Sequence, residues 1–161
     1  MEQIAVYTLR PLQEADDEAL LLEIYSSTRT DELALLPWDA AQKQSFLQMQ
    51  FSAQQKHYLD YFPQATHEMI LAEGQPIGRL YVDRRETEIR ILDVTLLPQA
   101  RGRGIGTQIL LELMKEANQE NQSCSIYVES FNRSLGLFQK LGFVKIEESG
   151  ASWLMEWRAS L

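Results

Sequence analysis

The segment Pro98–Thr107, PQARGRGIGT, holds the residues whose types and spacing point most clearly to chemistry. Glycines stand at alternate positions in it: Gly102, Gly104 and Gly106. Because glycine lacks a Cβ, the backbone N–H groups here can approach a ligand closely. Arg101 and Arg103 add whole positive charges, and a helix that begins here adds the partial charge of its N-terminus. The segment therefore predicts a cradle for a diphosphate.

Two common phosphate-binding loops do not fit this segment. A Walker loop requires a lysine and then a serine or threonine after its last glycine, whereas Thr107 follows Gly106 directly. The dinucleotide fingerprint has two residues before its third glycine and lies in an opening βαβ unit, whereas this loop follows several short strands. The sequence thus favours a different ligand that contains a diphosphate.

The elements that position this loop can be predicted from hydrophobic periodicity and turn residues. Helices are expected over Glu14–Ser27, from an Asp39 N-cap to Tyr61, over Gly104–Asn118 and over Asn132–Leu141. Strands are expected over Ile4–Arg10, Glu68–Glu73, Pro76–Asp83, Glu88–Leu97, Ser125–Glu129, Phe143–Glu147 and Ser152–Trp157. This order predicts an α/β (α+β) fold with a mixed central sheet of about seven strands, in a single domain over residues 1–161.

Composition and charge argue against several classes of protein. The net charge is −8, with 16 acidic and 8 basic residues before residue 98 and 7 of each after it. A basic face for duplex nucleic acid is therefore not expected. The apolar runs are too short to span a membrane, and no secretory signal begins the chain. With one cysteine, Cys124, and two separated histidines, no metal site is predicted. We expect a cytoplasmic protein.

Two segments resemble motifs of the GNAT superfamily of N-acetyltransferases. Gln99-x-x-Gly102-x-Gly104 is similar to the acetyl-CoA motif of that superfamily, R/Q-x-x-G-x-G/A. Val128–Phe143, VESFNRSLGLFQKLGF, resembles its second motif, in which an Asn at a helix entrance precedes a (Y/F)xxLGF close. The order of the elements is similar as well, over nearly the whole chain, and implies a GNAT-like sheet with helices on both faces.

The resemblance implies a site for acetyl-CoA and no metal. The pantetheine arm would lie between the strand before the loop and the next strand, bonded by backbone groups of Leu96 and Leu97. The pyrophosphate would be held by backbone amides of the loop: Arg101, Gly102, Arg103, Gly104, Ile105, Gly106 and Thr107. Gln99 belongs to the motif, and Asn132 matches a residue that commonly contacts the pantetheine or phosphate side of CoA.

The catalytic groups depart from the family pattern at one position. Many members carry a tyrosine that protonates the leaving thiolate, and Phe138 stands there. Another group or ordered water must then serve, or the thiolate leaves unprotonated. An ammonium acceptor must lose a proton before it attacks the thioester, and we predict Glu88 and Asp93 as the catalytic carboxylates. A solvated turn charge for Glu88 and a structural anchor for Asp93 stay open as alternatives.

The sequence thus predicts an acyltransferase that moves the acetyl group of acetyl-CoA to a primary amine of a small molecule or peptide, by direct attack in a ternary complex. A covalent route through Cys124 is less favoured. The alternative is a catalytically silent CoA-binding or protein-interaction domain with the same fold. The acidic balance before residue 98 favours a cationic acceptor. Neither the acceptor's identity nor the choice between monomer and homodimer can be predicted.

Overall fold

The structure, a computed structural model, describes residues 6–159. Its elements follow in the order β1 (Thr8–Pro11), α1 (Glu14–Ser27), α2 (Thr30–Ala34), α3 (Ala40–Tyr61), β2 (Thr66–Ala72), β3 (Gln75–Arg84), β4 (Glu88–Leu96), a 3₁₀ turn (Pro98–Ala100), α4 (Ile105–Gln119), β5 (Ser123–Glu129), α5 (Leu135–Lys140), β6 (Val144–Ser149) and β7 (Ser152–Trp157). Within this part of the chain, no helix is both long enough and apolar enough to cross a membrane.

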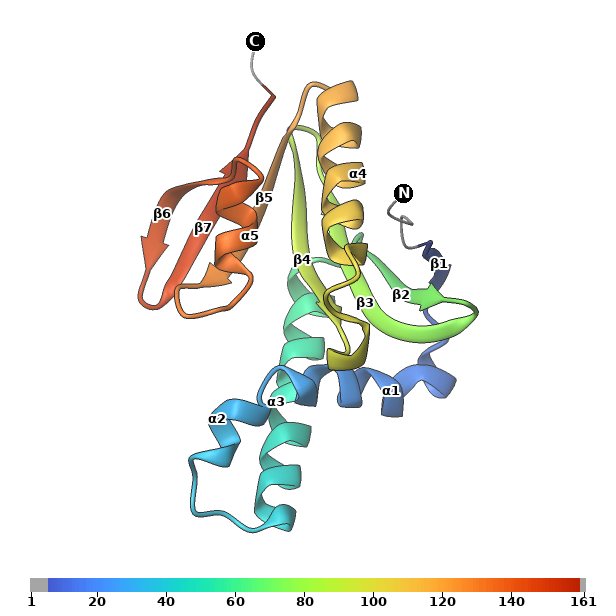
Figure 1. Ribbon diagram of the computed structural model, residues 1–161, viewed down its shortest axis with the longest axis vertical. Helices are drawn as coiled ribbons and strands as arrows, with labels where there is room; N and C mark the ends of the chain where they lie inside the picture. The colour runs from blue at the N-terminus through green and yellow to red at the C-terminus, as the bar shows by residue number, and fades with distance from the viewer. Residues whose placement is uncertain (1–5, 160–161) are drawn as a thin grey trace.

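The strands form one seven-stranded sheet in the order β1-β2-β3-β4-β5-β7-β6 (Figure 1). Neighbouring strands are antiparallel except β4 and β5, which are parallel. A parallel pair needs a crossover connection, and α4 supplies it. The predicted mixed α/β fold with a seven-stranded sheet is therefore confirmed.

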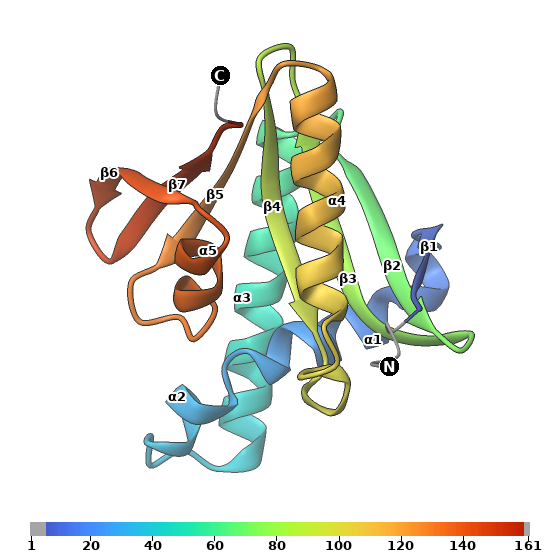
Figure 2. The ribbon, with the colours of Figure 1, turned by 45° about the horizontal axis from the view of Figure 1, so that its top comes forward.

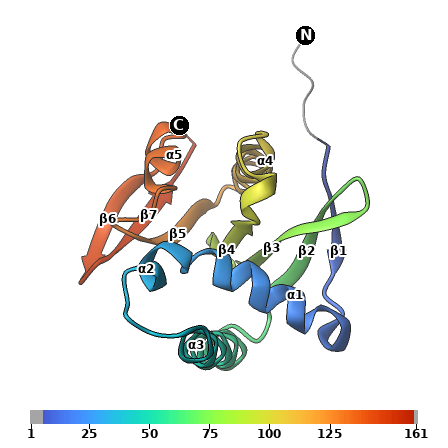
Figure 3. The ribbon, with the colours of Figure 1, turned by 60° about the horizontal axis from the view of Figure 1, so that its bottom comes forward.

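Helices cover both faces of the sheet (Figure 3). α4 and α5 lie over the larger apolar core, to which α4 contributes residues one turn apart: Ile105, Ile109, Leu113 and Ala117. α1 and α3 lie on the opposite face over a second core that includes Leu21, Ile24, Leu47 and Phe51. Apolar stripes at helical spacing thus fix the helices on the sheet.

β4 and β5 pair over only part of their length. Their paired rows run from Glu88↔Ser123 to Ile91↔Ile126, although the two strands continue beyond these rows to Leu96 and Glu129. Figure 2 shows the strands separating toward the end where the loop before α4 lies. We call this divergent region, Leu92–Leu96 with Tyr127–Glu129, the wedge.

A β-bulge marks the start of the wedge. Tyr81 of β3 is opposite Asp93, whereas the next residue, Val82, is opposite Ile91, so Leu92 is the extra residue. The Tyr58 hydroxyl of α3 donates a hydrogen bond to the Leu92 carbonyl (3.1 Å). A bulge bends its strand and strengthens the local twist, so this contact holds β4 where it leaves β5.

The predicted elements are found with small shifts at their ends. The first strand begins at Thr8, and its predicted start at Ile4 lies outside the described residues. The short helix α2 was not predicted. α5 begins at Leu135 rather than Asn132, because the Asn132 side chain accepts a hydrogen bond from the Ser134 amide (2.8 Å) and forms a turn before the helix.

Candidate active site

A cavity of about 680 Å³ occupies the wedge. Its walls are the ends of β4 and β5, the loop before α4 with the first turn of that helix, and the β5–α5 connection with part of α5. The end of α1 and the residues of α2 also border it, through Ser27, Thr28, Asp31 and Glu32. Because α1 lies on the face of the sheet opposite α4 (Figure 3), the cavity is bordered from both faces.

The glycine-rich loop presents backbone amides to this cavity. Gly102 and Gly104 have φ angles of 79° and 82°, which a residue with a Cβ rarely adopts. The first hydrogen bond of α4 runs from the Gln108 amide to the Gly104 carbonyl (3.0 Å). The amides of the first helical turn therefore lack a partner within the helix, and their residues line the cavity: Ile105, Gly106 and Thr107. A helix start of this kind suits a diphosphate.

The two arginines of the loop lie differently. Arg101 lines the cavity, and its Nε donates a hydrogen bond to the Leu96 carbonyl at the end of β4 (3.1 Å). Burial and the charge of Arg133 lower the pKa of Arg101, but a guanidinium stays cationic at neutral pH. Arg103 is exposed and does not line the cavity. Arg101 is thus the loop guanidinium that faces the cavity.

Leu97 differs from its neighbour Leu96, which lines the cavity. The Leu97 amide donates to the Ile77 carbonyl (2.7 Å), and the Leu97 carbonyl accepts from the Ala100 amide (2.9 Å). Both backbone groups of Leu97 are therefore engaged within the protein. Of the two residues predicted to bond the pantetheine arm, only Leu96 borders the cavity.

The motif fits the loop in a second register. Gln99, predicted as its first residue, does not line the cavity. Arg101-x-x-Gly104-x-Gly106 has the same spacing, and all three of these residues line it. Asn132 of the second motif lines the cavity as well. The geometry thus favours the register that starts at Arg101.

Asp93 lies beside the cavity. Its carboxylate accepts hydrogen bonds from the buried Arg79 guanidinium (2.6 Å) and from the Thr95 hydroxyl (2.6 Å). Arg79 is 1% exposed and also donates to Gln54 and Gln55 of α3. Thr95 lines the cavity and Asp93 does not, so a hydrogen bond from a lining residue joins Asp93 to the cavity wall.

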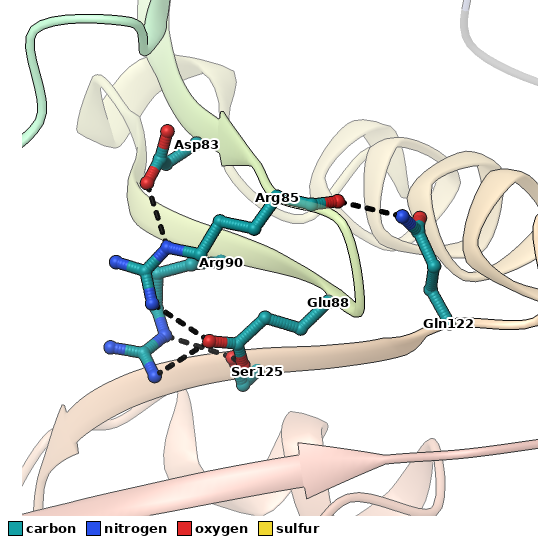
Figure 4. A network of polar contacts seen from close by, with 6 residues as sticks. All are labelled: Asp83, Arg85, Glu88, Arg90, Gln122 and Ser125. Carbon is teal, nitrogen blue, oxygen red and sulfur yellow. Dashed lines mark hydrogen bonds and ion pairs between the residues drawn. The ribbon is translucent and has the colours of Figure 1, made fainter.

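Glu88 lies at the closed end of the β4–β5 pair, away from the wedge. Figure 4 shows its carboxylate among Arg85, Arg90 and Ser125, with hydrogen bonds from Arg85 (2.8 Å) and the Ser125 hydroxyl (2.7 Å). Burial alone raises the pKa of Glu88, but the Ser125 hydrogen bond and the charges of Arg90 and Arg85 outweigh it and leave the pKa lowered. Glu88 does not line the cavity, so the structure does not bring it together with the loop.

Phe138 and Cys124 are core residues. Phe138 is 3% exposed, packs edge to face on Phe143 with ring centroids 5.4 Å apart, and borders the cavity. Cys124 is fully buried, and burial raises the pKa of its thiol to about 12. A buried, protonated thiol is a poor nucleophile.

Several lining residues were missed in the sequence, and two of them, Glu129 and Phe131, lie in or beside the wedge. Glu129 ends β5, and Phe131, which is 65% exposed, follows it in the β5–α5 connection. No spacing rule points to Glu129, because only the sheet topology brings it to a cavity shared with α1 and α2. Glu129 and Phe131 both lie within the second motif, Val128–Phe143, and membership of that motif was the available signal for both.

The sequence matches a model of the acetyltransferase (GNAT) family over residues 22–143. No curated protein matches it. Among solved structures, the PaiA N-acetyltransferase of Thermoplasma acidophilum in complex with coenzyme A is 19% identical, with a TM-score of 0.71 over 96% of this chain and 99% of that one.

Two further solved structures show the same fold. The ribosomal-protein-S18-alanine N-acetyltransferase of Escherichia coli is 14% identical, with a TM-score of 0.63 over 97% of this chain and 96% of that one. Arabidopsis thaliana Naa50, in complex with the bisubstrate analogue CoA-Ac-MVNAL, is 13% identical, with a TM-score of 0.61 over 95% of this chain and 99% of that one. The family model matches more than half of the chain, including every residue of the wedge and its cavity, so the chain belongs to the GNAT family of acetyltransferases and is an acyltransferase.

Proposed function

We propose that this enzyme transfers the acetyl group of acetyl-CoA to a primary amine of a small molecule or peptide, by direct attack in a ternary complex. The cavity in the wedge carries this proposal, because the first turn of α4 lines it from one face of the sheet and α1 and α2 border it from the other. A donor and an acceptor that enter from opposite faces meet between β4 and β5. The coenzyme A bound to PaiA and the CoA–peptide analogue bound to Naa50 support this arrangement.

The donor site is built from the glycine-rich loop and β4. The pyrophosphate binds the amides of the first turn of α4 with help from Arg101, while Gly102 and Gly104 keep the approach free of side chains. The pantetheine arm follows Leu96, and Asn132 contacts it from the β5–α5 connection. Gln99, Leu97 and Arg103 are the predicted donor residues with no place in the cavity wall.

The reaction joins the acceptor nitrogen to the thioester carbonyl. The ammonium first loses a proton, the amine attacks, and the C–S bond breaks to release CoA thiolate, which takes a second proton from the nitrogen through water. Phe138 has no proton to give. Of the two predicted carboxylates, Asp93 reaches the cavity through Thr95, whereas Glu88 needs a longer chain of water molecules.

The acceptor side carries exposed carboxylates, each of which also forms an ion pair: Asp31 with Arg133 (3.3 Å) and Glu32 with Arg29 (3.1 Å). Asp31 and Glu32 of α2 line the cavity where it opens beside α1, and their side chains are 87% and 52% exposed. Carboxylates at an opening raise the local concentration of cations. This supports a cationic amine as the acceptor.

The experiment is an assay of free CoA thiol released from acetyl-CoA with a panel of primary amines and short peptides. We expect release with at least one acceptor, together with the acetylated amine by mass spectrometry. Acetyl-CoA is also expected to raise the melting temperature, because it binds only the folded state. A protein that acetyl-CoA stabilises but that acetylates no amine is instead the silent CoA-binding domain.

A further inference from the structure

Glu129 differs from the other carboxylates that line the cavity. Asp31 and Glu32 are on α2, at the rim, whereas Glu129 is the last residue of β5 and is 37% exposed. It is three residues beyond Ile126, the last residue that pairs with β4. Among residues 6–159, Glu129 is thus the carboxylate that the strands of the wedge themselves bring to the cavity.

The side chain of Glu129 lies on the acceptor face of the sheet. Along β5 the side chains of Cys124, Ile126 and Val128 belong to the core under α4 and α5. Since successive side chains of a strand alternate between faces, Glu129 projects toward the opposite face, where α1 and α2 border the cavity. It therefore lies between the side from which the amine enters and the strand that lines the donor site.

The Glu129 carboxylate is held by a long ion pair rather than by hydrogen bonds. Its nearest cation is Arg29, whose guanidinium nitrogen is 3.7 Å away and is hydrogen bonded to Glu32 instead (3.1 Å). Within the described residues no group donates a hydrogen bond to the Glu129 carboxylate. Glu88 and Asp93, by contrast, each accept short hydrogen bonds from an arginine and a hydroxyl.

We infer that Glu129 binds the ammonium group of the acceptor and removes its proton, an inference that rests on the proposed function. The proton moves from the acceptor nitrogen to a carboxylate oxygen of Glu129 and then to solvent. The neutral amine forms the C–N bond with the acetyl carbonyl, and the C–S bond breaks to release CoA. Arg29 lies over the Tyr25 ring, 5.6 Å from its centroid, and orients the Glu129 carboxylate through their ion pair.

Glu129→Gln tests this inference, because it preserves size and removes the basic oxygen. With acetyl-CoA and an alkylamine that is active in the panel, we expect kcat to fall about 100-fold. The KM for acetyl-CoA and the rise in melting temperature with CoA stay unchanged. With a fluorinated analogue of that amine, much of which is already neutral at pH 7.5, the loss shrinks, because less proton removal is needed. Glu129→Asp retains part of the activity.

The matched control is Glu156→Gln. Glu156 is a partly exposed carboxylate on β7 that pairs with Arg158 (3.2 Å) and does not line the cavity. The kcat of the Glu156→Gln variant is therefore expected to equal that of the wild type. An unchanged kcat in Glu129→Gln overturns the inference, and so does an equal loss with both amines. A larger loss in a folded Asp93→Asn or Glu88→Gln variant also overturns it. A wild-type protein that binds acetyl-CoA and acetylates no amine instead overturns the proposed function.

Discussion

Gly106 is the glycine of the loop that can be replaced without straining the backbone. Gly102 and Gly104 have positive φ angles, so any side chain there is strained. Gly106 is helical, and a Cβ built on it meets only the Leu96 side chain, at 3.8 Å. A methyl group therefore fits, whereas the further methyls of valine extend into the space beside Leu96.

We predict that Gly106→Val abolishes most of the rise in melting temperature that CoA produces, while Gly106→Ala keeps it. The physical reason is that only the larger side chain occupies the donor site. Thermal unfolding with and without CoA measures both. Gly136→Val is the control, because Gly136 in α5 has open space around its Cβ and does not line the cavity. Equal CoA shifts in Gly106→Val and the wild type would place the donor elsewhere.

Residue types predicted only part of the site. The glycines and Arg101 are recognisable because a helix start that binds an anion needs them next to each other in sequence. Gln99 was predicted from the motif and Leu97 from the family resemblance. The structure places neither in the cavity wall, because the 3₁₀ turn over Pro98–Ala100 turns the chain back on itself. Glu129 lies within the second motif, but the residue pattern assigned it no chemical role.

At the scale of elements, the junction of β1 and α1 is fixed by a buried carboxylate. Asp17 is 3% exposed and accepts hydrogen bonds from both terminal nitrogens of Arg10 and from the Gln13 amide, all at 2.8 Å. The Arg10 hydrogen bonds, more than the Gln13 one, lower the pKa of Asp17 from 3.8 to about 2. Asp17 thus ties the start of α1 to the edge strand.

We predict that Asp17→Asn lowers the free energy of unfolding by about 1–3 kcal/mol at pH 7. Because the folded-state pKa is lowered, the ionised carboxylate stabilises the fold above pH 3.8, and this contribution disappears as the pH falls toward 2. Urea unfolding at pH 7 and pH 3 should therefore show a smaller difference between variant and wild type at pH 3. The exposed neighbour Asp16 provides the control, as Asp16→Asn. A difference that is the same at both pH values contradicts the assignment.

Element order and type were largely predictable, because their signals are local. The Asp39 N-cap is confirmed, with reciprocal hydrogen bonds to Gln42, and the predicted helix over Glu14–Ser27 is found with those bounds. The wedge was not predictable from residue patterns: β4 and β5 have the pattern of ordinary strands, and their pairing stops beside the Leu92 bulge and the Tyr58 contact. Only the resemblance to the GNAT superfamily implied it.

At the scale of the whole molecule, charge is unevenly distributed along the chain. Acidic residues outnumber basic ones two to one before residue 98 and equal them after it. The first part supplies α1 and α2, which border the acceptor side of the cavity, and the second part supplies the loop. The part of the chain that borders the acceptor side is therefore acidic, as suits a cationic acceptor, whereas the loop that would bind the anionic donor lies in the part with balanced charge.

We predict that kcat/KM for a polyamine falls as salt rises from 20 to about 300 mM, because the Debye length shortens to below roughly 8 Å. A monoamine of similar reactivity that carries no second charge should show a weaker dependence of kcat/KM on salt. The double variant Asp31→Asn with Glu32→Gln should reduce the salt dependence for the polyamine. Steady-state rates at several concentrations of potassium chloride measure this. Identical salt profiles for the two amines would exclude an acidic acceptor entrance.

The short parallel pairing of β4 with β5 also has a consequence for how the chain folds. The strands on either side of it, β1–β4 and β5–β7, are each joined by antiparallel pairings, whereas the two halves of the sheet meet only at rows Glu88↔Ser123 to Ile91↔Ile126. The pairing of β4 with β5 joins residues that α4 separates in the sequence, and such non-local pairing forms slowly. Until it forms, β4 and β5 are two open sheet edges, at which newly made chains are exposed to intermolecular strand pairing.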